Sequence, residues 1–440
     1  MKHAIVIGSS MAGLLAARAL SEHFEHVTVL ERDHLPEQSE HRKGVPQGHH
    51  AHGLLAAGLN SLETLFPGFT TTLVEAGALA GDFGANTSWF QFDCYKVRSQ
   101  SGFTGICMSR PLIESIVYAL VRKLPNISFV QNCAVLGLTS SPDQSRVTGV
   151  QYILEDSEVV KNLEADLVVD ASGRGSQTPK WLEVLGYAKP PETIVKINVG
   201  YASRTYQRQP NDFDGVLAVF VMAKAPLQKH NGAIFAIEGN RWILTVGGIL
   251  GDYPASDEVG FLEAIKNLPA PDIYNVVKNA EPLSEIVTFK YPQNQRRHFE
   301  RLERFPQGFL VFGDALCSFN PIYGQGMTVS ALEALALREE LRAGFMKLSK
   351  RFFARAATII ETPWTIAVGE DLRYPEVESP RTPSVNFINW YIGKVHLASR
   401  TDNVVCNAFH KVTNLLEAPP SLFAPRILAR VIGANLKPQP

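Results

Sequence analysis

Near its start the chain has a short apolar run that ends in glycine and leads into a helix-like stretch, and this feature constrains the fold most. The run Ala4–Ile7 (AIVI) is followed by Gly8, and from Met11 apolar residues recur at helical spacing. An uninterrupted apolar run is typical of a strand buried in a parallel sheet. The segment therefore predicts a strand, a tight glycine turn and a helix, which is the opening unit of a doubly wound α/β domain.

The turn matches the outer positions of the pattern GxGxxG, which places the pyrophosphate of a dinucleotide at the N-terminus of the helix. Ser10 stands where the pattern has its middle glycine. Serine is small and its hydroxyl can donate a hydrogen bond to a phosphate, so we expect the site to be kept. The alternative is a doubly wound domain that binds nothing at this turn. The cofactor-binding residues expected in this segment are Gly8, Ser10, Met11, Ala12 and Gly13.

A second strand-like run, HVTVLERD, ends in acidic and basic residues about twenty positions after the glycines. A carboxylate at this point can accept hydrogen bonds from the hydroxyls of an adenosine ribose. We expect Glu31 to do so, with Arg32 beside it at the cofactor.

Composition narrows the class of protein. With 440 residues, of which 45% are hydrophobic, the chain can form two domains or one large domain with an insertion. The formal net charge is −1 and the basic residues are scattered, which disfavours nucleic acid as a partner. Five dispersed cysteines without CxxC spacing disfavour both a disulfide framework and a zinc site. No apolar run is long enough to cross a bilayer, so we expect a cytoplasmic protein.

The most specific feature is residues 308–334, GFLVFGDALCSFNPIYGQGMTVSALEA. An apolar strand leads to Gly313 and Asp314, then to Pro321 and to a helix opened by glycines. The carboxylate of Asp314 would lie beside the free N–H groups of that helix, so it can accept hydrogen bonds from a sugar chain such as ribityl flavin. The helix N-terminus would stabilise negative charge on a reduced flavin. It comprises Gly324, Gln325, Gly326 and Met327.

With these residues the chain resembles the FAD-dependent monooxygenases of the aromatic-hydroxylase type, whose second FAD motif is GDAxxxxxPxxGxG. Residues 313–326 match it at every fixed position. The segment GSSMAG with Glu31 resembles the ADP-binding motif of the family, and SRPLIESIVYAL resembles the helix whose arginine, here Arg110, contacts the cofactor. A surface position for Arg110 is the alternative.

The middle motif, residues 165–179, departs from the family pattern. Gly173 and Ser176 match, whereas Ser172 replaces an aspartate and Pro179 falls near an expected arginine. The resemblance associates that aspartate and arginine with pyrophosphate and the nicotinamide dinucleotide. Direct use of NAD(P)H is therefore in question, and a partner flavin reductase is the other source of electrons.

Within the family, residues 42–59 (RKGVPQGHHAHGLLAAGL) and the segment DASGRGS are most similar to the epoxidases of polyether and related polyketide pathways, with squalene epoxidase more distant. We expect Gln47 and His49 to lie along the flavin. A metal site at His49, His50 and His52 is disfavoured, because neighbouring loop positions do not converge easily on one tetrahedral ion.

Strand-like runs between residues 193 and 250 alternate as in an antiparallel sheet with one packed face. Their side chains include few charges, which predicts an apolar substrate, although core packing explains such residues as well. The expected substrate-binding residues are Phe220, Met222, Phe235, Trp242 and Tyr323.

The resemblance and the patterns together predict an α/β fold: a Rossmann-like FAD-binding domain with an inserted antiparallel-sheet substrate domain and a C-terminal helical region. The expected bounds are residues 1–70, 106–188 and 286–344 for the first, 71–105 and 189–285 for the second, and 345–440 for the third. The amphipathic helices of the third region are expected to cap the core, with contact to a membrane surface as the less favoured alternative.

The resemblance implies a monooxygenase in specialised metabolism. Reduced FAD would react with O2 to a C4a-hydroperoxide and transfer one oxygen atom to a polyene, polyketide or terpenoid, by epoxidation or hydroxylation. The absence of a WxWxIP segment disfavours a halogenase. The alternatives are a prenyl reductase of the geranylgeranyl type, for which a YxWxFP segment is missing, and a non-enzymatic lipid-escort protein like the GDP-dissociation inhibitors.

Overall fold

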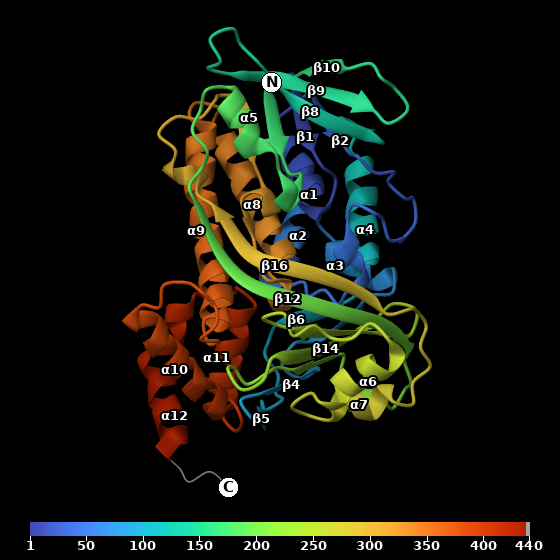
Figure 1. The fold of residues 1–440 in the computed structure, drawn as a ribbon, viewed down its shortest axis with the longest axis vertical. Coiled ribbons are helices and arrows are strands. Elements are labelled where there is room, and N and C mark those ends of the chain that lie inside the picture. Colours follow the sequence, from blue (N-terminus) through green and yellow to red (C-terminus); the bar gives the residue numbers. More distant parts are fainter. Residues whose placement is uncertain (437–440) are drawn as a thin grey trace.

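The computed structural model describes residues 1–436, and the upper part of the molecule in Figure 1 is organised around a parallel sheet. Its five strands run in the order β17-β11-β1-β2-β7. Ala4–Ile7 of the central strand is buried along its whole length, as the continuous apolar run predicts. The strands are β1 (His3–Ile7), β2 (His26–Leu30), β7 (Ile127–Val130), β11 (Leu167–Asp170) and β17 (Phe309–Val311).

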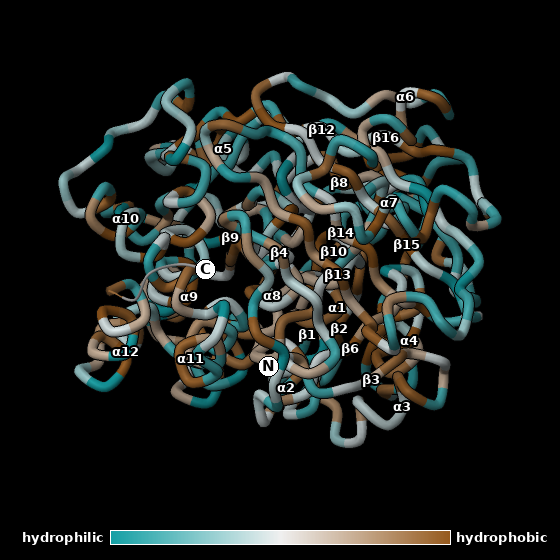
Figure 2. The backbone as a smooth tube through the Cα atoms, turned by 90° about the horizontal axis from the view of Figure 1, so that it is seen from below, coloured by the Kyte–Doolittle hydropathy of each residue, from teal (hydrophilic) through white to brown (hydrophobic). Residues whose placement is uncertain are grey.

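Helices cover this sheet and pack against one another. The first helix, α1, packs against α8 and α4, and α8 packs in turn against α2 and α9. Figure 2 shows hydrophobic segments gathered around β1, β2 and α1 in the interior. The helices are α1 (Met11–Leu20), α2 (Ala56–Leu65), α3 (Phe69–Glu75), α4 (Arg110–Arg122), α5 (Thr178–Val184), α8 (Gly326–Arg342) and α9 (Leu348–Asp371).

A second, larger sheet lies below the first in Figure 1. Its eight strands run in the order β18-β16-β12-β15-β14-β13-β4-β5, antiparallel except for the parallel pair of β13 and β4. Two helices, α6 (Glu258–Lys266) and α7 (Asp272–Val277), cover one of its faces. The strands are β4 (Thr87–Gln91), β5 (Cys94–Tyr95), β12 (Glu192–Gln207), β13 (Ala218–Val221), β14 (His230–Ile237), β15 (Arg241–Gly248), β16 (Val287–Arg297) and β18 (Cys317–Ser318).

The remaining strands described by the structure form two small sheets. One has the order β10-β9-β8 and the other pairs β3 with β6. Their bounds are β8 (Cys133–Ser140), β9 (Val147–Leu154), β10 (Lys161–Glu164), β3 (Leu79–Asp82) and β6 (Thr104–Cys107).

The C-terminal region is helical, as predicted, and forms a cap at the lower left of Figure 1. The long helix α9 leads into α10 (Pro383–Ala398), α11 (Asn403–Thr413) and α12 (Pro425–Leu436), which share a small hydrophobic core of their own. Within residues 1–436, no helix combines the length and the apolar character that crossing a membrane requires.

The structure confirms the predicted fold class, a parallel-sheet α/β unit with an antiparallel-sheet unit and a helical region. The structure does not divide the parallel-sheet unit from the antiparallel-sheet unit at the residue bounds expected from the sequence. β16 and β18 lie in the range assigned to the first domain, yet both pair within the eight-stranded sheet.

Candidate functional site

The first glycine turn has the geometry that its residues predict. Gly8 has a φ of 95° and donates its N–H to the carbonyl of Leu30 at 2.8 Å, so the turn is tied to the neighbouring strand. A Cβ on Gly13 would lie 1.9 Å from the carbonyl oxygen of Gly8. Any larger residue at position 13 would therefore separate the helix from the turn.

The N-terminus of α1 opens into a cavity of about 600 Å³, which we call the glycine cleft. Residues at the start of α1 line it together with residues at the start of α8: Ser10, Met11 and Ala12, and Gly324, Gln325, Gly326 and Met327. The hydroxyl of Ser10 makes no hydrogen bond within residues 1–436. Together with the N–H groups of the first helical turn, it is free to bind an anion.

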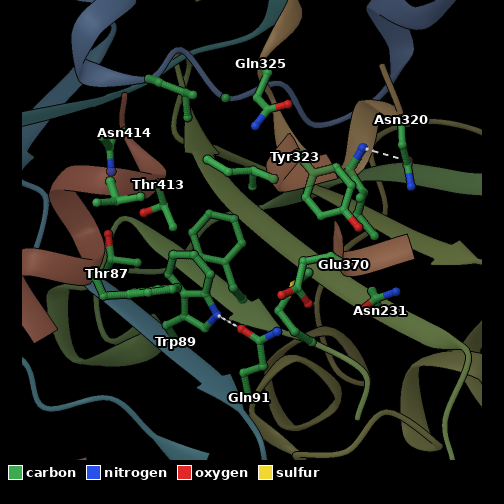
Figure 3. A pocket seen from close by; sticks show the side chains of 18 of the residues that line it. Thr87, Trp89, Gln91, Asn231, Asn320, Tyr323, Gln325, Glu370, Thr413 and Asn414 are labelled. Carbon is green, nitrogen blue, oxygen red and sulfur yellow. Dashed lines mark hydrogen bonds between the residues drawn. The ribbon is translucent and has the colours of Figure 1, made fainter. Parts of the chain in front are cut away.

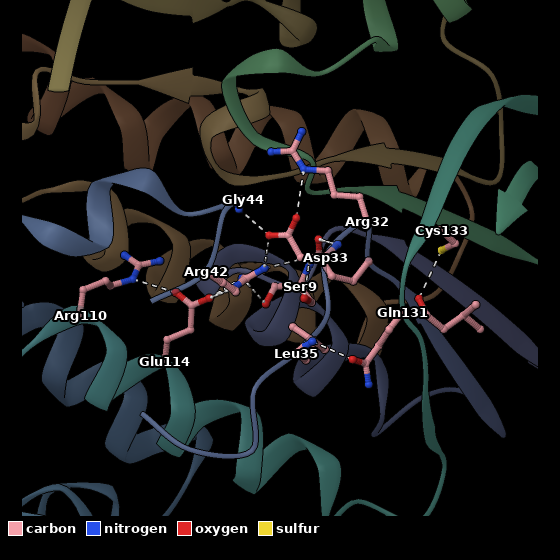
Figure 4. A network of polar contacts seen from close by, with 12 residues as sticks. Ser9, Arg32, Asp33, Leu35, Arg42, Gly44, Arg110, Glu114, Gln131 and Cys133 are labelled. Carbon is pink, nitrogen blue, oxygen red and sulfur yellow. Dashed lines mark hydrogen bonds and ion pairs between the residues drawn. The ribbon is translucent and has the colours of Figure 1, made fainter. Parts of the chain in front are cut away.

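At the end of β2, the carboxylate of Glu31 is engaged by the protein itself. It belongs to a polar network in which Arg42 lies close to Ser9, Asp33 and Glu114 (Figure 4). Ser9 donates its N–H at 2.7 Å and its hydroxyl at 2.6 Å to Oε2, and Asp33 donates its N–H at 3.0 Å to Oε1. The Arg42 guanidinium lies 3.3 Å from Oε2. Burial alone would raise the pKa of Glu31, but Arg42 and these donors hold it below its usual value. Glu31 and Arg32 both border the glycine cleft.

Arg42 is the centre of this network, and the sequence reasoning did not assign it a role. Its side chain is only 8% exposed and forms ion pairs with Glu31, Asp33 and Glu114. Glu114 in turn accepts a hydrogen bond of 2.9 Å from Nε of Arg110. Arg110 borders the glycine cleft, where the sequence places it. The signal for Arg42 was one basic residue in a loop, and only the fold brings the three carboxylates to it.

The second motif contributes an open acceptor. Asp314 follows β17, borders the glycine cleft and accepts no hydrogen bond from any residue in the range 1–436. Desolvation raises the pKa of Asp314, although the positive charges of Arg110 and Arg174 oppose the rise. Gly313 does not border the cleft. A Cβ there would lie 2.6 Å from Cβ of Ala12, so this glycine brings the two motifs together.

The loop after Pro321 also lines the glycine cleft. Gly324 has a φ of 63°, which favours glycine, and a Cβ there would lie 3.5 Å from the backbone of Gly53. Gln325 is 2% exposed, and its Oε1 has no hydrogen-bond partner within residues 1–436. A buried acceptor without a donor is costly, and a ligand in the cleft would supply one.

The histidine segment differs from the sequence expectation. Gln47 borders the glycine cleft, whereas His49 does not: it stacks on His41, with ring centroids 3.7 Å apart. The histidine that borders the cleft is His52. The structure thus places His52, and not the expected His49, at the cleft, because the ring of His49 packs against His41. Burial, reinforced by the charge of Arg110, lowers the pKa of His52 to about 3, so its ring is neutral.

The middle motif uses its carboxylate for its own loop. Asp170 is fully buried and accepts hydrogen bonds from Ser172, Ser176 and Thr178. Gly173, with Ser172 and Arg174, borders the glycine cleft. Ser172 therefore shapes the loop and holds no charge toward the cleft, where the family pattern has an aspartate.

A second cavity of about 400 Å³ adjoins the glycine cleft, and we call it the apolar cavity (Figure 3). Four of the residues expected to bind substrate border it: Phe220 and Met222 from β13 and the loop after it, Phe235 from β14 and Tyr323 from the loop before α8. The two cavities share four residues, which are His52, Gly53, Asn320 and Gln325. A ligand in the cleft and a small molecule in the cavity would therefore meet beside the N-terminus of α8.

The prediction for Trp242 is wrong. Trp242 is fully buried on the other face of the eight-stranded sheet, within the core under α6 and α7, and its Nε1 donates to Asp212 at 2.7 Å. Side chains alternate along a strand, and Ile243 lies on the opposite face from Trp242. The sequence shows that side chains alternate between the two faces of the strand, but it does not show which face lines the cavity.

A buried polar cluster stands where the two cavities meet. Asp371, at the end of α9, accepts hydrogen bonds from Asn294 at 2.7 Å, Asn320 at 3.1 Å and Tyr323 at 3.0 Å. Burial raises the pKa of Asp371 to about 6 despite these donors. Tyr201 also donates to Asn320 at 2.7 Å, so the loop before Gly324 is held from two sides.

Comparison with known proteins gives one relative along nearly the whole chain. Protein Rv3254 of Mycobacterium tuberculosis is 33% identical over 460 aligned residues, which cover 99% of this chain and 94% of the relative. No protein-family model matches the chain.

Solved structures share the fold at low sequence identity. The flavin-dependent brominase Bmp2 is 14% identical, with a TM-score of 0.64, and the match covers 99% of this chain and 100% of that one. PqsL of Pseudomonas aeruginosa, described as a probable FAD-dependent monooxygenase, is 14% identical, with a TM-score of 0.61, and covers 85% and 98% of the two chains. The fold is thus one that occurs in flavin-dependent enzymes.

Proposed function

Because the chain belongs to the same family as Protein Rv3254 of Mycobacterium tuberculosis and has the fold of flavin-dependent enzymes, we propose that it is an FAD-dependent monooxygenase acting on a small molecule with a large apolar part. The observation that carries this proposal is the contact between the glycine cleft and the apolar cavity at His52, Gly53, Asn320 and Gln325. Oxygen transfer requires the cofactor and the substrate to meet in one enclosed place.

The residues of the glycine cleft fit FAD. Glu31 would accept from the adenosine ribose, Ser10 and the first turn of α1 would bind the pyrophosphate, and Asp314 would accept from the ribityl chain. The orphaned Oε1 of Gln325 and the N-terminus of α8 would face the flavin ring. When bound, FAD supplies the activation of O2 and the bond-making chemistry.

The chain itself contributes positioning and exclusion of water. Phe220, Met222 and Phe235 give the cavity apolar walls, which keep water from a reactive oxygen species and hold an alkene or ring by burial of apolar surface. The neutral ring of His52 adds no charge where the cavities meet. Epoxidation and hydroxylation are both served by this arrangement, and we propose NAD(P)H or a partner reductase as the electron donor.

The proposal is tested by the visible spectrum of the purified protein and by stopped-flow mixing of the chemically reduced protein with oxygenated buffer. A transient spectrum that differs from both oxidised and reduced flavin supports a monooxygenase. Immediate return to oxidised flavin leaves two assignments, a hydroxylase that stabilises its oxygen adduct only with its own substrate bound and a reductase of the geranylgeranyl type. Consumption of reduced flavin by added prenyl alkenes without O2 identifies the reductase. A colourless protein that does not take up added FAD overturns the proposal in favour of a lipid-escort protein.

Bromide is a useful addition to this experiment, since the fold also occurs in a flavin-dependent brominase. A transient whose decay is unchanged by bromide supports oxygen transfer to an organic substrate. Accelerated decay together with bromination of an added phenol contradicts it.

A further inference from the structure

The apolar cavity has a polar end remote from the glycine cleft. Trp89 and Gln91 of β4 lie across the cavity from Gln325 (Figure 3). His396 of α10 and Phe409 of α11 also border the cavity. The helical cap therefore closes the cavity with a histidine.

Behind this histidine lies a buried cation. Lys96 follows β5, is 4% exposed and does not itself border the cavity. Its Nζ lies 2.6 Å from Nδ1 of His396, 5.2 Å from the centre of the Trp89 ring and 4.8 Å from that of Phe409. Within residues 1–436, Lys96 forms no ion pair with a carboxylate. Buried lysines are rare unless they are paired, so this charge lacks the partner that would balance it.

The acids that border the cavity are held by other groups. Asp82 accepts from the backbone of Ala85, Ser101 and Gly102. Glu370 is paired with Arg373 at 2.9 Å, and Asp371 is held by the donors described above. None of them forms an ion pair with Lys96. Desolvation lowers the pKa of Lys96 to about 8, and the charge of Glu370 is among the interactions that oppose this, so Lys96 is mostly protonated at neutral pH.

The proton of His396 is fixed by Lys96. Burial, and after it the charge of Lys96, holds the pKa of His396 well below its usual value, so the ring is neutral. Because the Lys96 ammonium can only donate to Nδ1, the ring proton is on Nε2. Stacking on Phe92, at 4.6 Å between ring centroids, fixes the plane of the ring. Nε2 has no hydrogen-bond partner within residues 1–436, so it is a free donor backed by a positive charge.

We propose that Lys96 and His396 form an anion-binding end of the apolar cavity, and that the substrate is amphipathic, with a carboxylate at the end remote from the atom that is oxidised. The carboxylate would accept from Nε2 of His396, and the charge of Lys96 would strengthen this bond through the ring. The statement about oxidation rests on the proposed function, whereas the binding of a carboxylate does not.

The test is displacement of the neutral apolar dye N-phenyl-1-naphthylamine from the whole protein by three ligands with the same chain: dodecanoate, methyl dodecanoate and dodecan-1-ol. In the wild type at pH 7, dodecanoate is expected to bind about tenfold more tightly than either neutral ligand. This is the ratio of dissociation constants that one additional charge-assisted hydrogen bond produces. Equal binding of all three overturns the proposal without any variant. The assay is run with and without added FAD, so failure to bind flavin and failure to prefer a carboxylate are separate results.

Two variants locate the preference. Lys96→Met and His396→Phe should each bring dodecanoate to within about twofold of dodecan-1-ol, while binding of dodecan-1-ol stays unchanged. Lys350→Met is the matched control, because it removes one positive charge from the exposed surface of α9 and should keep the full preference. If Lys96→Met does not fold, the result for His396→Phe decides between the outcomes. If a folded variant still prefers dodecanoate to dodecan-1-ol, the carboxylate binds at another site and the proposal is overturned.

Discussion

The hydroxyl of Tyr323 donates a 3.0 Å hydrogen bond to Asp371 and so ties the loop that carries Gly324 and Gln325 to the end of α9. Removing the donor in Tyr323→Phe leaves a buried carboxylate oxygen with Asn320 as its remaining donor. We expect a loss of about 1–2 kcal/mol in the free energy of unfolding, measured in urea. Tyr95→Phe is the control, because Tyr95 also donates to an aspartate, Asp272, but is 43% exposed. An equal loss of unfolding free energy in both variants would mean that the hydrogen bond between Tyr323 and Asp371 stabilises the chain no more than an exposed one does.

Asp371 makes stability depend on pH in a direction opposite to that of most carboxylates. Its pKa is raised from 3.8 to about 6 in the folded chain, so the folded state binds the proton more tightly. The associated stability is fully present below the unfolded pKa and is lost as pH rises through about 6. Relative to Asp371→Asn, the wild type should therefore lose stability between pH 4 and pH 6, by about 3 kcal/mol. Thermal unfolding of both proteins at several pH values measures the difference, and a difference independent of pH contradicts it.

Asp314→Ala should release FAD. If the carboxylate accepts from the ribityl hydroxyls, its removal costs one or two charge-assisted hydrogen bonds, and we expect affinity to fall about tenfold to a hundredfold. Flavin absorbance after gel filtration measures the occupancy. Asp143→Ala, in an exposed turn, serves as the control. Unchanged flavin occupancy in the first variant would remove Asp314 from the site.

Ser10→Gly restores the middle glycine of the first motif. Because the Ser10 hydroxyl has no partner within the described residues, the variant should bind FAD as tightly as the wild type or more tightly. Titration of the apoprotein by flavin fluorescence gives the dissociation constant. A loss of tenfold or more would mean that the hydroxyl itself binds phosphate.

The opposite faces of the large sheet should respond differently to substitution. Trp242→Phe removes the donor to Asp212 and some core volume, so stability should fall by about 1–2 kcal/mol while binding of N-phenyl-1-naphthylamine stays the same. Phe235→Ala enlarges the apolar cavity and should change dye binding. Dye titration and urea unfolding of each variant measure the two effects. Weaker dye binding in Trp242→Phe would show that Trp242 contributes to the cavity after all.

Local chain geometry explains which site residues could be read from the sequence. Gly8 and Gly13 belong to one local turn and Gly324 to another, and Asp314 is placed by the strand that precedes it. Their positions follow from the motifs alone. His49 was chosen over His52 because spacing within a short turn does not show which side chain points inward.

The remaining residues depend on contacts between distant segments. Arg42 meets Glu114 across 72 positions, and Lys96 meets His396 across 300. No pattern along the chain marks either pair. Asp371 lies on a helix that the sequence reasoning treated as a cap, and only the packing of α9 against the loop at Pro321–Tyr323 brings it to the junction of the two cavities.

The strands β12 and β16 run from beside α5 into the large sheet and pair with each other over most of their length (Figure 1). Their pairing joins the two units through a continuous run of main-chain hydrogen bonds. Separating the units between β12 and β16 would leave each piece with an unpaired strand edge, which is a template for aggregation.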